Sequence, residues 1–246
     1  MARAAGKGMA PPLGKLINNG RKKVRYEALT QQVYESIKGE ILDMRLKPGD
    51  RLTIDALARD MGVSISPVRE TLARLLAERL VEFKPYSGYV VAQLPSKKYF
   101  IDMVSTRILL ECHAVRIGAP RRSETIIREL EEALAGMDSH SLGTRYRDFR
   151  GYLEWDIRFH GLLIRSAENE VLIQIYEDLR SLNQFSRLYL YIGKQINQSR
   201  VRTEHEAILK AYREGDGEKA ARAVRSHLES TGKNIEKIGE PSAMMV

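Results

Sequence analysis

The sequence has little cysteine and no long apolar segment. Cys112 is the only cysteine in 246 residues, which excludes an intramolecular disulfide framework and favours a reducing compartment. No apolar run approaches the about 20 residues that a membrane-spanning helix needs, and the first residues form no hydrophobic secretory segment. We therefore expect a cytoplasmic chain with no membrane partner. With 43% hydrophobic residues, it is long enough to build two modest cores.

Residues 48–92 contain signals for two short helices, a tight turn and a β-hairpin. The pattern predicts a helix from Ile54 to Met61 that ends at Gly62, where a residue without Cβ can adopt positive φ. A second helix is expected to begin at Ser66-Pro67, with serine as the N-cap and proline at the first helical position. Two β-prone runs then flank the turn residues 85–88. This order is typical of a winged helix-turn-helix.

The second helix is the candidate recognition helix. Its apolar face includes Val68 and Leu72, so the remaining positions are expected to face outward. Helix-turn-helix proteins contact base edges with the first turn of this helix, and arginine can bind guanine through two parallel hydrogen bonds. Arg69 is the leading base contact. The full set of expected DNA-binding residues is Ser64, Ser66, Arg69, Thr71, Arg74 and, at the wing, Gly88. The alternative is an ordinary helical subdomain whose arginines are only solvated.

The segments PGDRL, GVS, PVRETL and LVE, followed by a glycine-containing wing, resemble the DNA-binding domain of GntR-family bacterial transcription regulators. The resemblance extends over the whole motif and implies double-stranded operator DNA as a partner. The family usually has arginine where this chain has Ile65. We therefore expect DNA binding to be kept but the operator sequence to differ from the usual one.

Acidic residues are absent from positions 1–25, which contain seven basic residues. Residues 26–97 contain ten basic and ten acidic residues, so most of the net charge of +8 lies in this first segment. Its glycines and prolines make a helix unfavourable and predict a flexible basic arm over residues 1–25. Such an arm would add phosphate contacts that weaken with salt. A solvated extension without a role is the alternative.

Beyond Pro95 the pattern changes to long helices with caps and breakers between them. The expected helices are Ser96 to Gly118, Ser123 to Met137, Thr144 to Ala167, Asn169 to Gly193, Gln198 to Glu214 and Glu218 to Ile238. The predicted fold is thus mainly α: an N-terminal winged helix-turn-helix with a small β-hairpin wing, then an all-α antiparallel bundle. The predicted organisation is a basic arm (1–25), a DNA-binding domain (26–95), a bundle for effector binding and dimerisation (96–238) and a tail (239–246).

The bundle's polar residues suggest a metal site. Asp156 and His160 are four residues apart and share one side of a helix whose neighbouring positions are apolar. His205 and His227 each lie near the apolar edge of a later helix. One carboxylate and three imidazoles are a suitable ligand set for a divalent transition metal, Zn²⁺ first, with Ni²⁺ or Mn²⁺ also possible. Spacing alone does not bring the distant histidines together, so unrelated core or surface positions remain the alternative.

The stretch WDIRFH and the later TEHEAILKAYREGDGEKAARAVRSHL resemble the FCD ligand-binding domain of the FadR-like branch of GntR regulators. In that branch, members with a D-x-x-x-H pair and two later histidines hold a metal in the bundle. The resemblance therefore implies that the ligands are Asp156, His160, His205 and His227. Arg107, four residues before Glu111, resembles the family's effector-binding arginine; an exposed i, i+4 ion pair is the alternative.

Together these features predict a homodimeric, metabolite-responsive DNA-binding regulator, in this family usually a repressor, and not an enzyme. A small carboxylate would bind the metal directly while Arg107 binds its other end. Three alternatives remain: a metal-responsive regulator, a helical metal-dependent hydrolase that activates water, and a purely architectural DNA binder.

Overall fold

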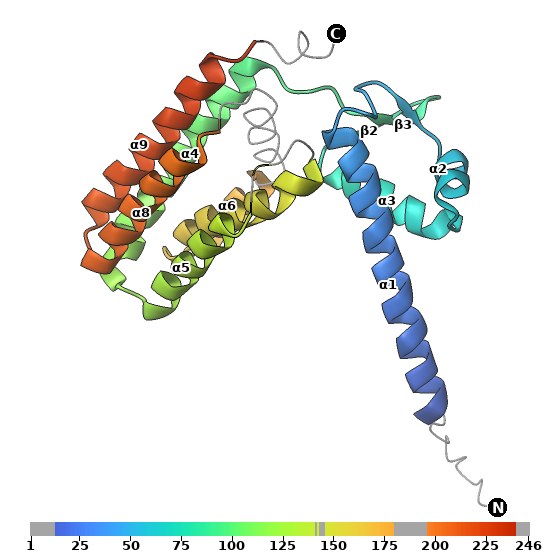
Figure 1. Ribbon diagram of the computed structural model, residues 1–246, viewed down its shortest axis with the longest axis horizontal. Helices are drawn as coiled ribbons and strands as arrows, with labels where there is room; N and C mark the ends of the chain where they lie inside the picture. Colours follow the sequence, from blue (N-terminus) through green and yellow to red (C-terminus); the bar gives the residue numbers. More distant parts are fainter. Residues whose placement is uncertain (1–12, 141, 143–145, 180–195, 240–246) are drawn as a thin grey trace, which may run out of the picture. The chain divides into compact units, whose positions relative to one another are not determined.

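A computed structural model describes the backbone of residues 13–140, 142, 146–179 and 196–239. The chain divides into two compact units, the first made of Met1–Glu40 and Asp50–Val91, the second of Ile41–Gly49 and Ala92–Val246 (Figure 1). Within the described ranges, no helix is long and apolar enough to cross a membrane. The fold is mainly helical with one small antiparallel sheet, as the sequence predicts.

The first unit is a winged helix-turn-helix preceded by a long helix. The hydrophobic side chains of its third helix, Val68, Leu72 and Leu75, are fully buried, as is Val81 of the following strand. The elements in chain order are α1 (Leu13–Leu42), β1 (Arg51–Leu52), α2 (Ile54–Met61), α3 (Ile65–Ala77), β2 (Val81–Lys84) and β3 (Gly88–Val91).

The turn between α2 and α3 has the expected geometry. Gly62 ends α2 with φ of 65° and donates its N–H to the α2 carbonyls, which is the left-handed cap that glycine favours. The expected start of α3 is wrong by two residues, because Ser64, and not Ser66, is the extended N-cap residue. Pro67 therefore occupies the third helical position, where a missing N–H still costs nothing because the first four N–H groups have no intrahelical partner.

The wing contains one more strand than expected. β2 and β3 form the predicted hairpin, with Val81 opposite Val91 and Lys84 opposite Gly88. The short β1 pairs with the other edge of β3 and gives the sheet order β1-β3-β2. A strand of two residues is too short to show an alternation of apolar and polar positions, so no sequence pattern indicates it.

The helix α1 corrects the prediction of an irregular arm. It begins at Leu13, so residues 13–25 are helical, while residues 1–12 of the predicted arm lie outside the described residues. Gly14 and Gly20 each disfavour a helix by about 1 kcal/mol. Extending an existing helix is nevertheless far easier than nucleating one, and the segment that follows is anchored by Val33 and Ile37, both buried.

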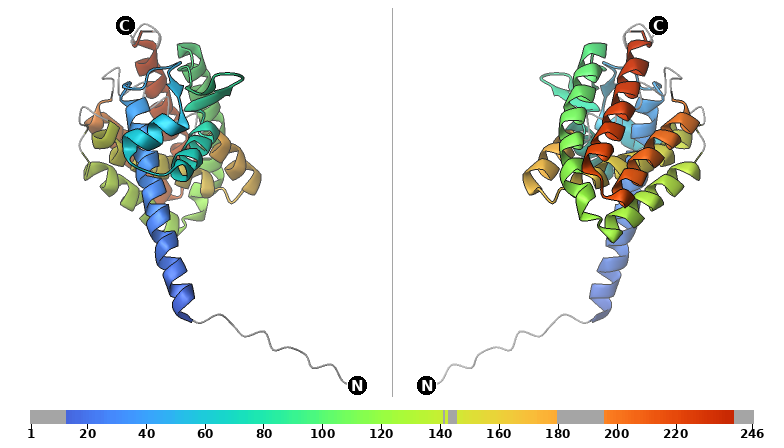
Figure 2. Two further views of the ribbon diagram at one scale, coloured as in Figure 1. Left: turned by 90° about the vertical axis from the view of Figure 1, so that its right-hand side faces the viewer. Right: turned by 90° about the vertical axis from the view of Figure 1, so that its left-hand side faces the viewer.

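The second unit is a helical bundle, as predicted. Its described helices are α4 (Lys97–Gly118), the short η1 (Ala119–Arg121), α5 (Glu124–Asp138), α6 (Tyr146–Arg165), a helix over residues 170–179, α8 (Gln198–Glu214) and α9 (Gly217–Glu236). Of the expected helix Asn169 to Gly193, only the start is described, and residues 180–193 lie outside the described residues. In the bundle α4 packs along α9, α9 along α8, and α5 along α6 (Figures 1 and 2).

Glycines allow two close approaches in this bundle. A Cβ at Gly118 would overlap the Ser166 side chain, whose hydroxyl bonds to the Leu163 carbonyl at 2.7 Å and to the Tyr212 hydroxyl at 2.6 Å. A Cβ at Gly136 of α5 would overlap the indole ring of Trp155 of α6.

Cys112 is buried and its thiol lies 3.4 Å from the carbonyl oxygen of Ala221.

Candidate metal centre and nucleic-acid interface

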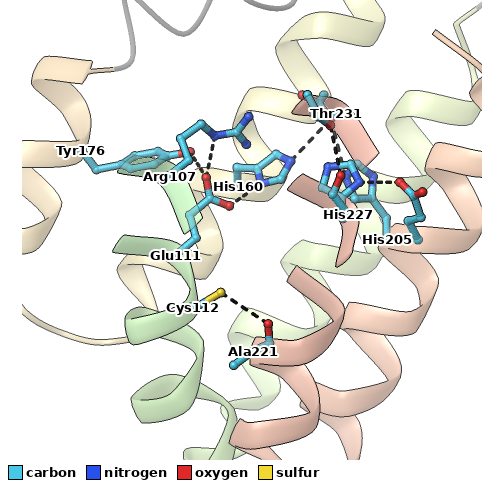
Figure 3. Close-up of polar contacts among 11 residues, drawn as sticks. Arg107, Glu111, Cys112, His160, Tyr176, His205, Ala221, His227 and Thr231 are labelled. Atoms are coloured by element: carbon cyan, nitrogen blue, oxygen red, sulfur yellow. Dashed lines mark hydrogen bonds and ion pairs between the residues drawn. The ribbon is translucent and has the colours of Figure 1, made fainter. Parts of the chain in front are cut away.

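Three helices of the bundle bring the predicted metal ligands together. Asp156 and His160 occupy successive turns of α6, while α8 supplies His205 and α9 supplies His227. All four side chains are buried, His205 completely. Each histidine offers one ring nitrogen, and these three nitrogens lie within 4.8 Å of one another. The convergence that spacing alone could not establish is therefore present in the structure (Figure 3).

Asp156, the fourth predicted ligand, lies close to two of the three histidines. Its Oδ1 lies 3.8 Å from Nε2 of His160 and 3.7 Å from Nε2 of His205. Three neutral imidazoles and one carboxylate are donors that Zn²⁺ and other divalent transition metals accept. The donor set and its burial thus fit a divalent cation.

Glu111 of α4 holds the ring of His160 in orientation through its Nδ1 atom. Its Oε2 lies 2.7 Å from Nδ1 of His160, while Oε1 accepts from Nε of Arg107 at 2.7 Å and from the hydroxyl of Tyr176 at 2.9 Å (Figure 3). Burial acts to raise the pKa of Glu111, but the charge of Arg107 and the hydrogen bond with His160 together keep that pKa far below its usual range. Glu111 is therefore an ionised acceptor.

The ionised Glu111 determines which nitrogen of His160 carries the proton. Burial lowers the pKa of His160 to about 4 against the opposing attraction of Glu111, so the imidazole is neutral at neutral pH. Its single N–H must then be on Nδ1, which faces the Glu111 carboxylate. This leaves the lone pair of Nε2 directed toward the group, the arrangement that metal-binding histidines usually share.

Glu204 has the same relation to His227. Its Oε2 lies 2.7 Å from Nδ1 of His227, and although burial acts to raise the pKa of Glu204, the hydrogen bond with His227 contributes most to lowering it overall. Sequence reasoning assigned no role to Glu204 and treated Glu111 only as the neighbour of Arg107. No local pattern indicates this contact, because Glu204 and His227 lie on different helices, 23 positions apart in the sequence.

Arg107 is buried beside this group. The expected alternative, an exposed ion pair with Glu111, is wrong, because neither side chain has more than 4% of its surface exposed. Arg107 lines a cavity of about 50 Å³ together with described residues of α6 and α9, including Asp156, His160 and His227. Space of about 10 to 15 Å³ holds one water, so this cavity has room for an ion with a few waters or for one small carboxylate group.

The recognition helix presents fewer free residues than expected. Ser64, Ser66 and Arg69 are exposed at and near the start of α3, as DNA contact requires. Thr71 is buried, with 1% of its surface exposed, so its expected outward direction is wrong. It lies next to the buried Leu72 on the side of α3 that is covered by the core.

Arg74 is exposed, as expected, but it also contacts α1, so its role in DNA binding stays a prediction. Its guanidinium lies 3.5 Å from the ring centroid of Tyr34, its Nη1 donates to Gln31 at 2.9 Å, and its Nε donates to Glu78 at 3.3 Å. Lys38 also donates to Glu78, at 2.8 Å. Burial acts to raise the pKa of Glu78, but the charges of Lys38 and Arg74 lower it overall.

At the wing, Gly88 begins β3 with φ of 74°, a conformation that favours glycine, while its contact with DNA stays a prediction. Tyr86, at the tip of the same turn, is completely exposed. Sequence reasoning placed Tyr86 in the turn but gave it no role. Among the described wing residues it offers a large aromatic surface with no covering side chain.

Comparison with known families agrees with both units. The first matches the model of the bacterial regulatory proteins of the gntR family over residues 29–91. The second matches the FCD domain over residues 102–230, which is about half of the chain. The two matches together cover most of the helices and strands described above.

Individual relatives agree over nearly their whole length. The galactonate operon transcriptional repressor of Escherichia coli is 25% identical over 228 residues, covering 85% of this chain and 97% of the relative. The regulator LutR of Bacillus subtilis is 30% identical over 203 residues, covering 74% of this chain and 90% of the relative. The crystal structure of a GntR regulator from Rhodococcus superimposes with a TM-score of 0.64 at 24% identity, covering 86% of this chain and 99% of that one.

These relatives are regulators of transcription, so the hydrolase alternative is set aside. The winged helix-turn-helix, the bundle and the matches over both place this chain in the gntR family of bacterial regulatory proteins, as a DNA-binding transcription regulator with a C-terminal FCD domain.

Proposed function

We propose that the chain is a cytoplasmic repressor whose affinity for its operator is controlled by a small carboxylate bound beside a divalent metal in the bundle. The observation that supports this most directly is the meeting of three histidine nitrogens within 4.8 Å in a buried group. The cavity beside them is lined by both Asp156 and Arg107.

The metal would be held by Asp156, His160, His205 and His227. When bound, it supplies a positive charge that attracts a carboxylate, and Zn²⁺, Ni²⁺ and Mn²⁺ all suit these donors. Glu111 and Glu204 hold two of the imidazoles in orientation through their Nδ1 atoms. The protein's own contribution is thus a preformed, buried set of ligands.

Arg107 would hold the effector's second end. A guanidinium binds a carboxylate through two parallel hydrogen bonds, and the Glu111 carboxylate fixes the position of Arg107 through its Nε. The small cavity favours a short organic acid. The name of the relative in Escherichia coli, which assigns it to the galactonate operon as a repressor, is consistent with repression.

Control of transcription requires two states with different effector affinity. A homodimer would place two α3 helices on an approximately palindromic operator. Effector binding in the bundle would favour the state whose two DNA-binding units no longer match the spacing of the half-sites.

Elemental analysis of untagged protein purified without a chelator tests the metal first. We expect about one metal per chain in wild type, in line with a single four-ligand site, and none in His205→Ala or His227→Ala. His113→Ala is the control, since His113 is exposed on α4 outside the group. A series of small carboxylates is then tested for release of metal-loaded protein from DNA. Absence of metal from folded wild type, or retention in both variants, would disprove the site.

The size of the cavity also supports a second candidate, a regulator that responds to the metal itself. Space of about 50 Å³ accommodates an ion without requiring any further ligand. DNA binding that depends on metal and is unchanged by every carboxylate would favour this function over metabolite sensing.

A further inference from the structure

We propose that the N-terminal part of α1, residues 13–25, is a second DNA-binding element that contacts the phosphate backbone beside the site read by α3. This inference rests on DNA binding by the family and is independent of the metal and the effector.

The contacts between α1 and α3 define the direction of α1. Tyr26 donates to Glu70 at 2.8 Å. Further along both helices Arg74 bonds to Gln31, and Glu78 bonds to Tyr34 and Lys38. Later residues of α1 thus contact later residues of α3, so the two helices run in the same direction. The N-terminal end of α1 therefore points toward the same side of the unit as the N-terminal end of α3.

The N-terminal end of α1 extends past the start of the recognition helix. From Glu70 only five residues remain to the first residue of α3, Ile65, whereas α1 continues from Tyr26 back to Leu13. At about 1.5 Å per residue, residues 13–25 span about 20 Å. Figure 1 shows this part of α1 projecting clear of α2, α3 and the strands of its own unit.

The projecting segment has the charge that a DNA backbone requires. It contains five basic residues, Lys15, Arg21, Lys22, Lys23 and Arg25, and no acidic residue. Duplex DNA has one phosphate charge per about 1.7 Å of its axis, so a helix of this length meets several phosphates at once. The rest of the unit, residues 26–40 and 50–91, contains seven basic and nine acidic residues and so has no excess of positive charge. The positive charge that DNA binding needs is thus concentrated where α1 passes beyond α3.

The test is a variant in which the five basic residues are replaced by glutamine, K15Q/R21Q/K22Q/K23Q/R25Q. The matched control removes five positive charges from exposed positions of the bundle, R128Q/K210Q/R222Q/K233Q/K237Q. Binding is measured to a duplex selected from a random pool with wild-type protein, over a series of salt concentrations. Each lost phosphate contact makes the negative slope of log K against log salt shallower by about 0.9. We expect the magnitude of this slope to decrease by about 2 to 4 for the first variant and to stay unchanged for the control.

A second measurement uses the same duplex with its two flanks removed. Wild type and the control are expected to lose affinity, while the first variant, which no longer uses the flanks, should bind both duplexes equally. Equal salt slopes for the two variants, or equal effects of trimming in all three proteins, would disprove the proposal. A change of oligomeric state in the first variant without a change of slope would assign the segment to contacts between copies and also disprove it. Failure of wild type to select any duplex would contradict DNA binding itself.

Discussion

Arg69 and Arg74 lie five residues apart on α3 and have different surroundings. Arg69 is exposed near the start of the helix, whereas Arg74 is stacked on Tyr34 and bonded to Gln31. We expect Arg69→Ala to weaken specific DNA binding by about 1 to 3 kcal/mol and to relax the preference at one base pair. Fluorescence anisotropy with the selected duplex and its single-base variants measures both effects.

Arg74→Ala serves as the contrast. Loss of the arginine side chain removes a cation–π contact and two hydrogen bonds, which together stabilise the first unit by about 1 to 2 kcal/mol. The thermal unfolding temperature should therefore fall, while the base preference stays that of wild type. An altered base preference in Arg74→Ala, with unchanged stability, would show instead that Arg74 reads DNA.

Glu111 acts on the metal group through His160. Glu111→Gln replaces the ionised acceptor with a neutral amide, and loss of such an outer partner typically lowers metal affinity about 10- to 100-fold. Competition with a chelator measures this affinity. Glu218→Gln is the control, because Glu218 pairs with Arg116 at the surface of α9. An affinity equal to that of wild type would show that Glu111 does not orient a ligand.

Because Glu111 also binds the buried Arg107, its replacement can destabilise the bundle. Glu204→Gln removes the equivalent partner of His227 from a more exposed position and keeps the question testable. A reduced metal affinity in a variant whose circular dichroism matches wild type separates orientation of the ligand from folding.

At the scale of the elements, Gly118 and Gly161 should respond oppositely to alanine. A Cβ at Gly118 would lie 2.9 Å from the backbone carbonyl carbon of Ser166, so Gly118→Ala must separate α4 from the end of α6, which costs about 1 to 3 kcal/mol. At Gly161, within α6, a Cβ would meet nothing within 4 Å. Gly161→Ala should stabilise the bundle by about 0.5 to 1 kcal/mol, since glycine is a poor helix former.

Denaturant unfolding of both variants measures these differences in the free energy of unfolding. The same sign in both would show that the contact at Gly118 relaxes without cost, or that α6 is limited by something other than helix propensity.

Elements were predictable where local chemistry determines them. Gly62 and Gly215 end helices with positive φ, and Asn197 caps α8 with its side chain, all of which short-range signals indicate. The N-terminal half of α1 was not predictable, since its glycines favour irregular backbone and its helical form depends on continuity with the anchored half. The burial of Thr71 also follows from tertiary packing.

At the candidate site, too, local spacing was predictable from the sequence and contacts between distant residues were not. The i, i+4 spacing predicted that Asp156 and His160 share a side, and the structure brings His205 and His227 to them. The contact of Glu111 with His160 joins α4 to α6 across 49 positions of sequence. Within α4 alone the same residue is indistinguishable from an ordinary partner of Arg107.

At the scale of the whole molecule, metal binding should stabilise one unit and not the other. A ligand that binds only the folded state adds about 2.7 kcal/mol when present at 100 times its Kd, and all proposed metal ligands belong to the second unit. We expect a chelator to lower the Tm of the bundle and to leave the Tm of the winged helix unchanged in differential scanning calorimetry. The double variant H205A/H227A should not respond to chelator or metal. A shift of both transitions in wild type would indicate that the units unfold as one.

Trp155 gives the protein an optical reporter. It is the sole tryptophan of the chain, it packs on Gly136 of α5 with the guanidinium of Arg158 5.1 Å from its ring, and it precedes Asp156 in the sequence. Because the winged helix contains no indole, intrinsic emission excited at the red edge of the absorption band comes from the bundle alone. Events that move α5 against α6 can thus be followed in the unlabelled protein, in the presence of DNA, without any signal from the unit that binds it.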